Sequence, residues 1–487
     1  MSIEYVLIDS HFENEKDESL LHGRFIPYGL AILDNTMKTA GYQGLLLLEN
    51  KEYNAFINST NQQNNSIKLI GISSTTITRF DAKTKIEECR ATFPKSIIVA
   101  GGHHFGNCAE DALINIPQLD IVVRGEGDEA IIDIMRYACG SLAINAINGI
   151  SYRDEYGSVI SRGPKLIVEN LPSIEFVEKF YSMEQFVQNP LSADMPIPSM
   201  NILAGRGCPH NCIFCSVNRT RVRRYPVEDI VNMIEKTTKK FNIRGVKFYD
   251  DSLTLSNSYV SALCDEIIRR KLDIVWFCDS RANINLDLLS LMYSAGCRYI
   301  AVGLETGSPK IQKIVDKNIT KEQVMQFAIK CKEVGISTYV FLMASFPDET
   351  PEDLELTIDI ARDLSKKGKA IAGSMGAAVI LPGTQLEKIA RERGILAEDF
   401  SWHKPFNDQL NLDYDVPPNI PLYREGISPE VYKNAKRKML ANYANSLSLR
   451  IFCKNLIENI LRRDISWAEK MTIGSNIFKA KIKSLFS

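Results

Sequence analysis

The chain has 487 residues, of which 45% are hydrophobic and 24% are charged, and its formal net charge is −1. This composition is typical of a globular protein, and it excludes a wholly disordered chain and a general polyanion-binding protein. The length predicts about three domains. No apolar run reaches the roughly 20 residues that a membrane-spanning helix needs, and the acidic N-terminus lacks the basic segment of a secretory signal. We therefore expect a cytoplasmic protein.

The first region, residues 1–145, alternates short apolar segments with helical ones. Strands are expected at Val6–Asp9, Leu45–Leu48, Ile67–Ile72, Ile97–Ala100 and Ile121–Val123, and helices include Leu30–Ala40 and Asp81–Phe93. Short apolar strands that alternate with helices predict a parallel α/β sheet.

Small and polar residues follow the ends of three of these strands. They are Ser73, Ser74, Thr75, the run Gly101-Gly-His-His104 and the run Arg124-Gly-Glu-Gly127. Ligands of open α/β sheets bind beyond the carboxyl ends of the strands, and glycine allows a backbone to approach a ligand closely. Ordinary strand-to-helix turns are the alternative explanation. The first strand is not followed by GxGxxG, which disfavours a dinucleotide site.

Four segments of this region resemble the cobalamin-binding domain that precedes many radical SAM enzymes. They are Pro27-Tyr-Gly-Leu30, Gly71-Ile-Ser-Ser74, Gly101-Gly-His-His104 and Arg124-Gly-Glu-Gly127. The family usually has Gly-Gly-Pro-His, and His103 replaces the proline here. The resemblance implies a Rossmann-like domain that binds cobalamin through Ser73, Thr75, Gly101, Gly102, His103, His104, Gly125 and Glu126. It implies no histidine on cobalt, so His11, His103 or His104 as an axial ligand is the less favoured alternative.

The chain has eleven cysteines, an odd number that does not suit a disulfide framework. Three of them, Cys208, Cys212 and Cys215, form a CxxxCxxC motif directly after an apolar strand. Three thiolates can hold three irons of a four-iron cluster and leave one iron open, as a catalytic metal requires. A structural zinc held by these cysteines and His210 is the alternative. We expect the other cysteines to be buried as small apolar residues.

Residues 196–400 repeat strand then helix. Strands are expected at Ile202–Gly205, Val246–Tyr249, Ile274–Cys278, Tyr299–Gly303, Thr338–Met343 and Ala377–Ile380. A capping box at Thr320–Gln323, a stop at Gly335 and an N-cap at Thr350 followed by Pro351 mark helix ends. Six such units suggest a partial parallel barrel, in which chemistry lies at the carboxyl ends of the strands. Polar residues gather at those ends: Asp250, Asp251, Ser252, Asp279, Ser280, Arg281, Glu305, Thr306 and Ser345.

This second region resembles the radical SAM core. The matching pieces are the cysteine loop, Phe248-Tyr-Asp-Asp-Ser-Leu-Thr254, Ala295-Gly-Cys297, Gly303-Leu-Glu-Thr-Gly-Ser308 and Phe346-Pro-Asp-Glu-Thr350, in family order. The resemblance implies that Cys208, Cys212 and Cys215 bind a four-iron, four-sulfur cluster and act in catalysis. It also implies a SAM site formed by Phe214 near the adenine, Asp250 and Asp251 at the amino group, and Ser280, Arg281 and Glu305. Phe346 departs from the glycine that the family usually has before the proline.

Residues 146–195 are mixed in composition and are expected to link the two domains. Residues 401–487 are expected to form a mostly helical domain, and residues 421–487 carry 13 Lys and Arg against 5 Asp and Glu. A helical cap over the barrel is the favoured interpretation of this basic tail. Peripheral contact with a membrane surface, or with an anionic substrate, is the alternative. No nucleic-acid motif stands out.

Together, the two resemblances imply a cobalamin-dependent radical SAM enzyme similar to the class B radical SAM methyltransferases. Such an enzyme would use a four-iron, four-sulfur cluster and SAM to generate a 5′-deoxyadenosyl radical, with cobalamin as methyl carrier, and would methylate an unreactive carbon of a small molecule or lipid. An electron donor such as flavodoxin or ferredoxin would be its partner. A cobalamin-assisted radical cyclase or oxidoreductase without methyl transfer is the first alternative. A cobalamin or redox sensor is an alternative of another class.

Overall fold

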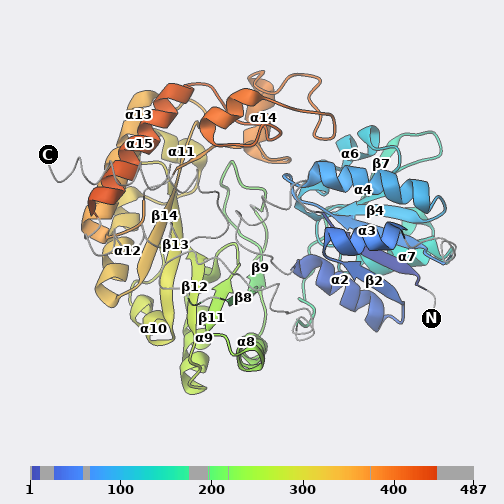
Figure 1. Cartoon of the computed structure of the whole chain (residues 1–487), viewed down its shortest axis with the longest axis horizontal. Coiled ribbons are helices and arrows are strands. Elements are labelled where there is room, and N and C mark those ends of the chain that lie inside the picture. The colour runs from blue at the N-terminus through green and yellow to red at the C-terminus, as the bar shows by residue number, and fades with distance from the viewer. Residues whose placement is uncertain are drawn as a thin grey trace. The chain divides into compact units, whose positions relative to one another are not determined.

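The computed structural model of the chain describes residues 3–10, 27–58, 66–174, 196, 198–217, 219–372 and 375–446. It divides into two compact units. The described residues of the first unit come from residues 1–18, 25–181 and 381–407, and those of the second come from residues 182–380 and 408–487. Each unit is built around a parallel sheet (Figure 1).

The sheet of the first unit has the strand order β2-β1-β3-β4-β5-β6-β7. Its strands are β1 (Tyr5–Asp9), β2 (Gly44–Leu47), β3 (Leu69–Ser73), β4 (Ile97–Gly101), β5 (Ile121–Val123), β6 (Ile150–Arg153) and β7 (Val159–Arg162). The first five strands are parallel, and β6 and β7 are antiparallel additions. The order of the parallel strands is that of flavodoxin-like doubly wound sheets, in which the order reverses between β1 and β3.

Helices cover both faces of this sheet. They are α2 (Tyr28–Thr39), α3 (Asn50–Asn58), α4 (Arg79–Thr92), α5 (Gly102–Phe105), α6 (Ala109–Asn115) and α7 (Ala130–Ala138), with η1 (Ile144–Ala146) after α7. Buried residues of α3, α4 and α6 form one apolar core with one face of the strands. Residues of α2 and α7 form a second core with the other face. The alternating faces of apolar strands therefore produce the doubly wound α/β unit that the sequence predicts.

The first unit also contains two segments that were not expected in it from the sequence. The region expected to be a linker contains the β6–β7 hairpin, which extends the sheet at β5. Residues 381–407, which follow the barrel in sequence, also pack in this unit and contain α14 (Gln385–Glu392). Within this segment Trp402 and His403 are buried.

The second unit is a six-stranded parallel sheet in the order β15-β14-β13-β12-β11-β8, as the partial barrel requires. The strands are β8 (Ser199–Ile202), β11 (Gly245–Phe248), β12 (Val275–Ser280), β13 (Cys297–Glu305), β14 (Ser337–Ala344) and β15 (Gly376–Ala377), and β9 (Gly205–Arg206) pairs with β10 (Arg223–Arg224). The last strand is shorter than the expected Ala377–Ile380. The helices are α8 (Val227–Phe241), α9 (Asn257–Arg269), α10 (Leu288–Ser294), α11 (Pro309–Val315), α12 (Lys321–Val334), α13 (Pro351–Asp363) and α15 (Pro429–Ser446), with short turns η4 (Leu253–Leu255), η5 (Leu364–Gly368) and η6 (Gln409–Tyr414).

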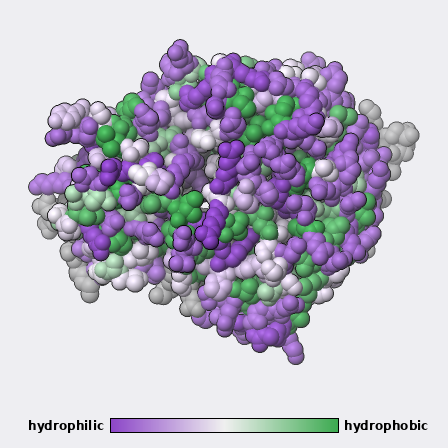
Figure 2. All heavy atoms as spheres, turned by 180° about the vertical axis from the view of Figure 1, so that it is seen from behind, coloured by the Kyte–Doolittle hydropathy of each residue, from purple (hydrophilic) through white to green (hydrophobic). Residues whose placement is uncertain are grey.

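In the described residues, no helix is both long and apolar enough to cross a membrane. On the face drawn in Figure 2, hydrophobic residues form scattered groups between hydrophilic ones. The greater part of the basic tail, residues 447–487, and His11 lie outside the described residues.

Candidate functional site

The three cysteines of the CxxxCxxC motif lie on one loop of the second unit, between β9 and β10. Two hydrogen bonds hold the ends of the loop together, since the Thr220 hydroxyl accepts from the amide of Cys208 at 2.8 Å and the Thr220 amide donates to the Cys208 carbonyl at 2.9 Å. Gly207 begins the loop at φ 95°, where a Cβ atom would lie 2.2 Å from the Arg221 carbonyl oxygen. The antiparallel β9–β10 pair therefore closes the loop and fixes the position of the thiols.

Cationic groups surround the buried thiol of Cys212. Burial raises the pKa of this thiol, while Lys317 and Arg281 act in the opposite direction. Arg281 also forms a side-chain hydrogen bond with Cys212. Because iron binds the thiolate and not the thiol, these cations favour the ligating form. The donor set and its charge therefore fit an iron–sulfur cluster.

His210 lies within the same loop. Its buried Nε2 atom has no hydrogen-bond partner among the described residues. Burial, followed by repulsion from Arg281 and Lys317, lowers its pKa. The imidazole of His210 is therefore neutral beside these two cations.

Phe214, the residue expected near the SAM adenine, is partly buried beside Phe346. Their ring centroids are 5.9 Å apart. Phe346 is fully buried and follows Ser345, which has a φ of 70°. The aromatic residue that replaces the usual glycine therefore packs against the cysteine loop.

The two adjacent aspartates after β11 have different surroundings. Asp250 is buried; one of its oxygens accepts from the amide of Ala204 at 2.9 Å and the other pairs with Arg224. Burial raises the pKa of Asp250 to about 6, against the opposing effect of Arg224. Asp251 is exposed. Of the two residues expected at the SAM amino group, Asp250 therefore positions the β8 and β10 ends, and Asp251 is accessible to a ligand.

The ends of β12 and β13 carry Ser280, Arg281 and Glu305, and all three are buried. Ser280 shares a 2.6 Å hydrogen bond with Thr254. Glu305, at φ 69°, forms an ion pair with Lys317, and a Cβ atom on Gly303 would collide with both partners. The ion pair thus occupies the space beside the first glycine of the Gly-Leu-Glu-Thr-Gly-Ser motif, and a larger residue there would displace it.

Charged and aromatic side chains occupy one face of the barrel sheet, opposite the face packed with apolar residues. Lys247 donates to the Tyr249 hydroxyl at 2.7 Å, and its ammonium lies 5.1 Å from the Phe277 ring centroid. Burial lowers the pKa of Lys247 to about 8, and Asp279 acts against this shift. Tyr299 and Tyr339 continue this face. Aromatic rings with one ammonium suit an organic ligand with an apolar body.

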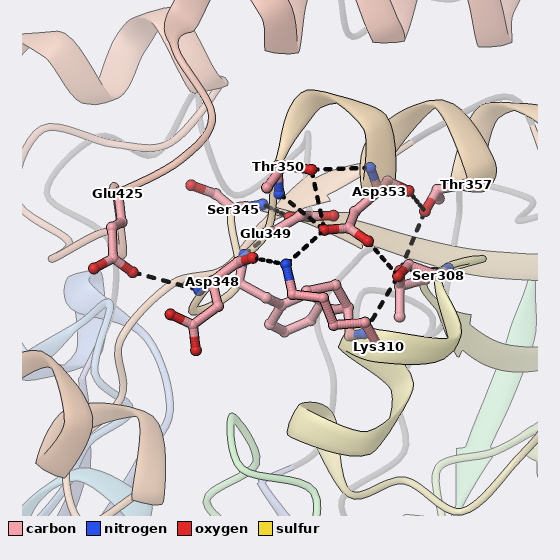
Figure 3. A network of polar contacts seen from close by, with 12 residues as sticks. Ser308, Lys310, Ser345, Asp348, Glu349, Thr350, Asp353, Thr357 and Glu425 are labelled. Atoms are coloured by element: carbon pink, nitrogen blue, oxygen red, sulfur yellow. Dashed lines mark hydrogen bonds and ion pairs between the residues drawn. The ribbon is translucent and has the colours of Figure 1, made fainter.

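A network of polar contacts behind the end of β14 fixes the Phe346 turn (Figure 3). Glu349 accepts from the amides of Ser345 and Phe346 at 2.5 and 3.0 Å. Asp353 accepts from Ser308 at 2.6 Å and Lys310 at 3.0 Å. The network holds the start of α13 against the start of α11, close to the strand ends that form the site.

In the first unit, most residues expected at cobalamin lie at the carboxyl edge of the sheet. They are Ser73, Thr75, Gly101, Gly102, His103 and Gly125, which are exposed or partly exposed. Gly102 has a φ of 87°. The large apolar side chain of Ile77 is 40% exposed at the same edge. An exposed apolar side chain beside glycine-containing turns fits a large, flat ligand such as a corrin.

Three of the residues expected at cobalamin, His104, Gly125 and Glu126, have internal contacts. The imidazole of His104 is fully buried. Glu126 accepts from the amide of Val168 at 2.7 Å, and a Cβ atom on Gly125 would lie 2.2 Å from the Leu166 carbonyl oxygen. Gly125 and Glu126 therefore have a structural reason for their identity, which is the alternative that the sequence left open.

Sequence reasoning missed three residues that shape these sites. Arg224 and Lys317 pair with the two buried carboxylates of the barrel, and Thr78 shares hydrogen bonds with Ser10 and Ser74 near the β1/β3 reversal. Arg224 lies in a basic run, Arg221-Val-Arg-Arg224, which is a signal that could have indicated it. Lys317 and Thr78 follow no pattern in the sequence.

Comparison with known protein families gives two matches. Residues 202–361 match the radical SAM superfamily, and residues 21–134 match the B12 binding domain. The chain is 28% identical over 340 residues to an uncharacterized methyltransferase of Pyrococcus horikoshii, which covers 69% of this chain and 72% of that protein. It is 25% identical over 352 residues to the anaerobic magnesium-protoporphyrin IX monomethyl ester cyclase of Rubrivivax gelatinosus, covering 70% of this chain and 62% of that protein.

Two solved structures share the fold along the chain. The methyltransferase TsrM of Kitasatospora setae, solved with cobalamin and a [4Fe-4S] cluster, has a TM-score of 0.68 at 15% identity and full coverage of both chains. OxsB, a cobalamin-dependent SAM radical enzyme solved with aqua-cobalamin and SAM, has a TM-score of 0.70 at 16% identity, covering 100% of this chain and 72% of that one. At these identities the likeness is one of fold.

Proposed function

We propose that this chain, which matches the radical SAM superfamily and the B12 binding domain, is a cobalamin-dependent radical SAM enzyme that transfers a methyl group from SAM to an unreactive carbon of a small organic substrate. The observation that carries the proposal is the presence in one chain of a B12 binding domain and a cysteine loop at the mouth of a partial barrel. The methyltransferase of Pyrococcus horikoshii among its relatives supports the choice of methyl transfer. We place the enzyme in the cytoplasm, with a flavodoxin-like or ferredoxin-like electron donor.

The residues of the cysteine loop and of the expected SAM site have separate roles in this proposal. Cys208, Cys212 and Cys215 hold the cluster, and Arg281 favours the thiolate form of Cys212. Phe214 lies against the adenine, and Asp251 accepts from the SAM amine. When bound, the cofactors supply an adenosyl radical and a methyl carrier. The protein holds, orients and shields them.

Further residues keep the SAM site ordered and dry. The Lys317–Glu305 pair and the Arg224–Asp250 pair are buried, so each charge is neutralised where water is excluded. Phe346 is fully buried behind the cysteine loop. A dry, preorganised site limits side reactions of a reactive intermediate. The aromatic face that carries Lys247 supports a substrate with an apolar body.

The methyl-carrier role can be tested without knowledge of the substrate. Anaerobically purified, reduced enzyme is incubated with SAM that carries a deuterated methyl group. We expect S-adenosylhomocysteine to form and the label to appear in the extracted corrin fraction. The Cys212→Ala variant should contain less cluster iron and should lose 5′-deoxyadenosine formation, while Cys139→Ser, at an exposed cysteine, should behave as wild type.

The second candidate is a cobalamin-assisted radical cyclisation or oxidation without methyl transfer. The cyclase of Rubrivivax gelatinosus among the relatives favours it. It predicts 5′-deoxyadenosine without S-adenosylhomocysteine and an unlabelled corrin fraction. That result would contradict methyl transfer and leave the radical SAM assignment intact.

A further inference from the structure

Three side chains of the first unit place metal-ligating atoms around one buried point. They are His104, Cys108 and His403, whose ligand atoms all lie within 4.8 Å of one another. His104 Nε2 lies 3.6 Å from Cys108 Sγ, and the centroids of the two imidazole rings are 5.1 Å apart. We propose that these residues bind one zinc ion, at a site separate from the cysteine loop of the barrel.

The separation of the nitrogen and sulfur atoms suits zinc. Bonds of about 2.0–2.1 Å to nitrogen and about 2.3 Å to sulfur, at a tetrahedral angle, place the two ligand atoms about 3.5 Å apart. His104 and Cys108 are four residues apart and already have this spacing. Imidazole with thiolate is a borderline-soft donor set of the kind that zinc prefers. Three protein ligands leave a fourth position for water or another ligand.

His403 is the residue that most needs a partner. Its side chain is fully buried, and its Nε2 atom has no hydrogen-bond partner among the described residues. The other ring nitrogen, Nδ1, lies 2.7 Å from a carboxylate oxygen of Asp111. A buried polar atom without a partner is costly. A carboxylate on the far nitrogen of a histidine is the usual outer partner of a zinc ligand, so zinc at Nε2 accounts for both observations.

His104 is oriented in the same way, by a hydrogen-bonding group at its Nδ1 atom. Thr76 Oγ1 lies 3.2 Å from Nδ1 of His104, which leaves Nε2 toward Cys108. Arg79 is buried nearby, where its guanidinium donates to the carbonyls of Thr76 and Trp402. Its positive charge opposes a cation but favours the thiolate form of Cys108.

Two carboxylates act against the charge of that arginine. Burial is the main cause that raises the pKa of the Cys108 thiol, and the nearby carboxylates Asp111 and Glu387 raise it further. Three cations, Arg79, Lys83 and Lys165, also act on the ligand groups, and Glu387 forms an ion pair with Arg391. Charges of both signs therefore surround the three ligand atoms.

The site would join distant parts of the chain. His104 belongs to α5 and Cys108 precedes α6, whereas His403 lies 292 residues beyond Asp111, in the segment that follows the barrel. Zinc would fasten residues 381–407 to the carboxyl edge of the first unit's sheet. This role does not depend on methyl transfer.

The test is zinc analysis of the full-length enzyme by elemental mass spectrometry, after incubation with ZnCl2 and desalting. We expect about one zinc per chain. Zinc K-edge X-ray absorption, which does not respond to iron or cobalt, should show one sulfur at about 2.3 Å and two or three nitrogen or oxygen atoms at about 2.0–2.1 Å. Asp111→Asn should weaken zinc binding by about 10- to 100-fold.

Variants separate this site from zinc bound adventitiously at the cluster cysteines. Cys108→Ser and His403→Gln should each reduce bound zinc at least tenfold and leave iron content unchanged, whereas the control Cys139→Ser should retain both metals. Far-UV circular dichroism shows whether each variant has folded. A spectrum with three sulfur ligands, zinc retained in both variants, or no stoichiometric zinc in wild type would overturn the proposal.

Discussion

Buried carboxylates of the barrel unit differ in their hydrogen-bonding partners. Asp250 and Glu305 each have a cationic partner, Arg224 and Lys317. Glu349 has two backbone amides on one oxygen, and its other oxygen, Oε1, is buried with no hydrogen-bond partner among the described residues. Its pKa is raised from 4.5 to about 7, chiefly by burial. Burial thus keeps Glu349 protonated at a pH where an exposed glutamate is ionised.

The first prediction concerns the Glu349→Gln variant. Between pH 4.5 and about 7 the folded chain holds a proton on Glu349 that the unfolded chain releases, so this residue's contribution to stability falls as pH rises through that window. At about 1.4 kcal/mol per pKa unit, the loss approaches about 3 kcal/mol above pH 7. Glutamine keeps the amide contacts without a charge. The variant should therefore lose less stability than wild type between pH 5 and pH 8.

Urea denaturation at several pH values measures this difference. The control is Glu333→Gln, at an exposed glutamate of α12, which should keep the wild-type pH dependence. Parallel curves for Glu349→Gln and wild type would show that Glu349 is ionised in the folded chain.

At the scale of elements, the residues at the helix N-termini stabilise the outer layer of the barrel. Thr320 and Gln323 form a capping box at α12, which ends at Gly335 with a φ of 91°, and Thr350 caps α13 with Pro351 at its first position. These predictions from sequence are confirmed, because capping depends on residues within one turn. The contact of Asp353 with Ser308, the N-cap of α11, was not predicted, because 45 residues separate the two.

The two capping boxes should therefore differ in their contribution to stability. Gln323→Ala removes a local contact at α12 and should cost about 0.5–1 kcal/mol. Asp353→Ala removes the matching capping-box contact at α13 together with charge-assisted bonds to Ser308 and Lys310, so it should cost about 2–3 kcal/mol. Denaturation midpoints give the energies. Hydrogen exchange should increase at the start of α11 in Asp353→Ala alone; equal effects of the two variants would refute the link between the helices.

At the scale of the molecule, the sequence predicted both sheets because apolar strands and helical periods repeat locally. The cluster cysteines were also evident, since their spacing lies within one loop. Residues 381–407 were assigned to other domains, because their packing on the first unit depends on contacts about 300 residues away. For the same reason the meeting of His104 with His403 could not be predicted. Local patterns determine elements, while burial of a returning segment depends on the completed fold.

The packing of residues 381–407 in the first unit leads to the last prediction. Trp402 is buried in the first unit, where its indole donates to Glu387 at 2.9 Å and its carbonyl accepts from Arg79 at 2.9 Å. Trp402→Ala should destabilise this unit by about 3–5 kcal/mol, the usual cost of removing a buried tryptophan. Hydrogen exchange should then accelerate in α4 and in β4, and should be unchanged in β12 and β13.

The matched variant is Trp276→Ala in the barrel, where the indole is equally buried and donates to the Ala295 carbonyl at 2.8 Å. It should accelerate exchange in β12 and β13 and spare α4 and β4. Reciprocal effects follow if each unit has its own core, because exchange reports the opening of the cooperative unit to which an amide belongs. Acceleration throughout the chain by either variant would mean that the two units open as one.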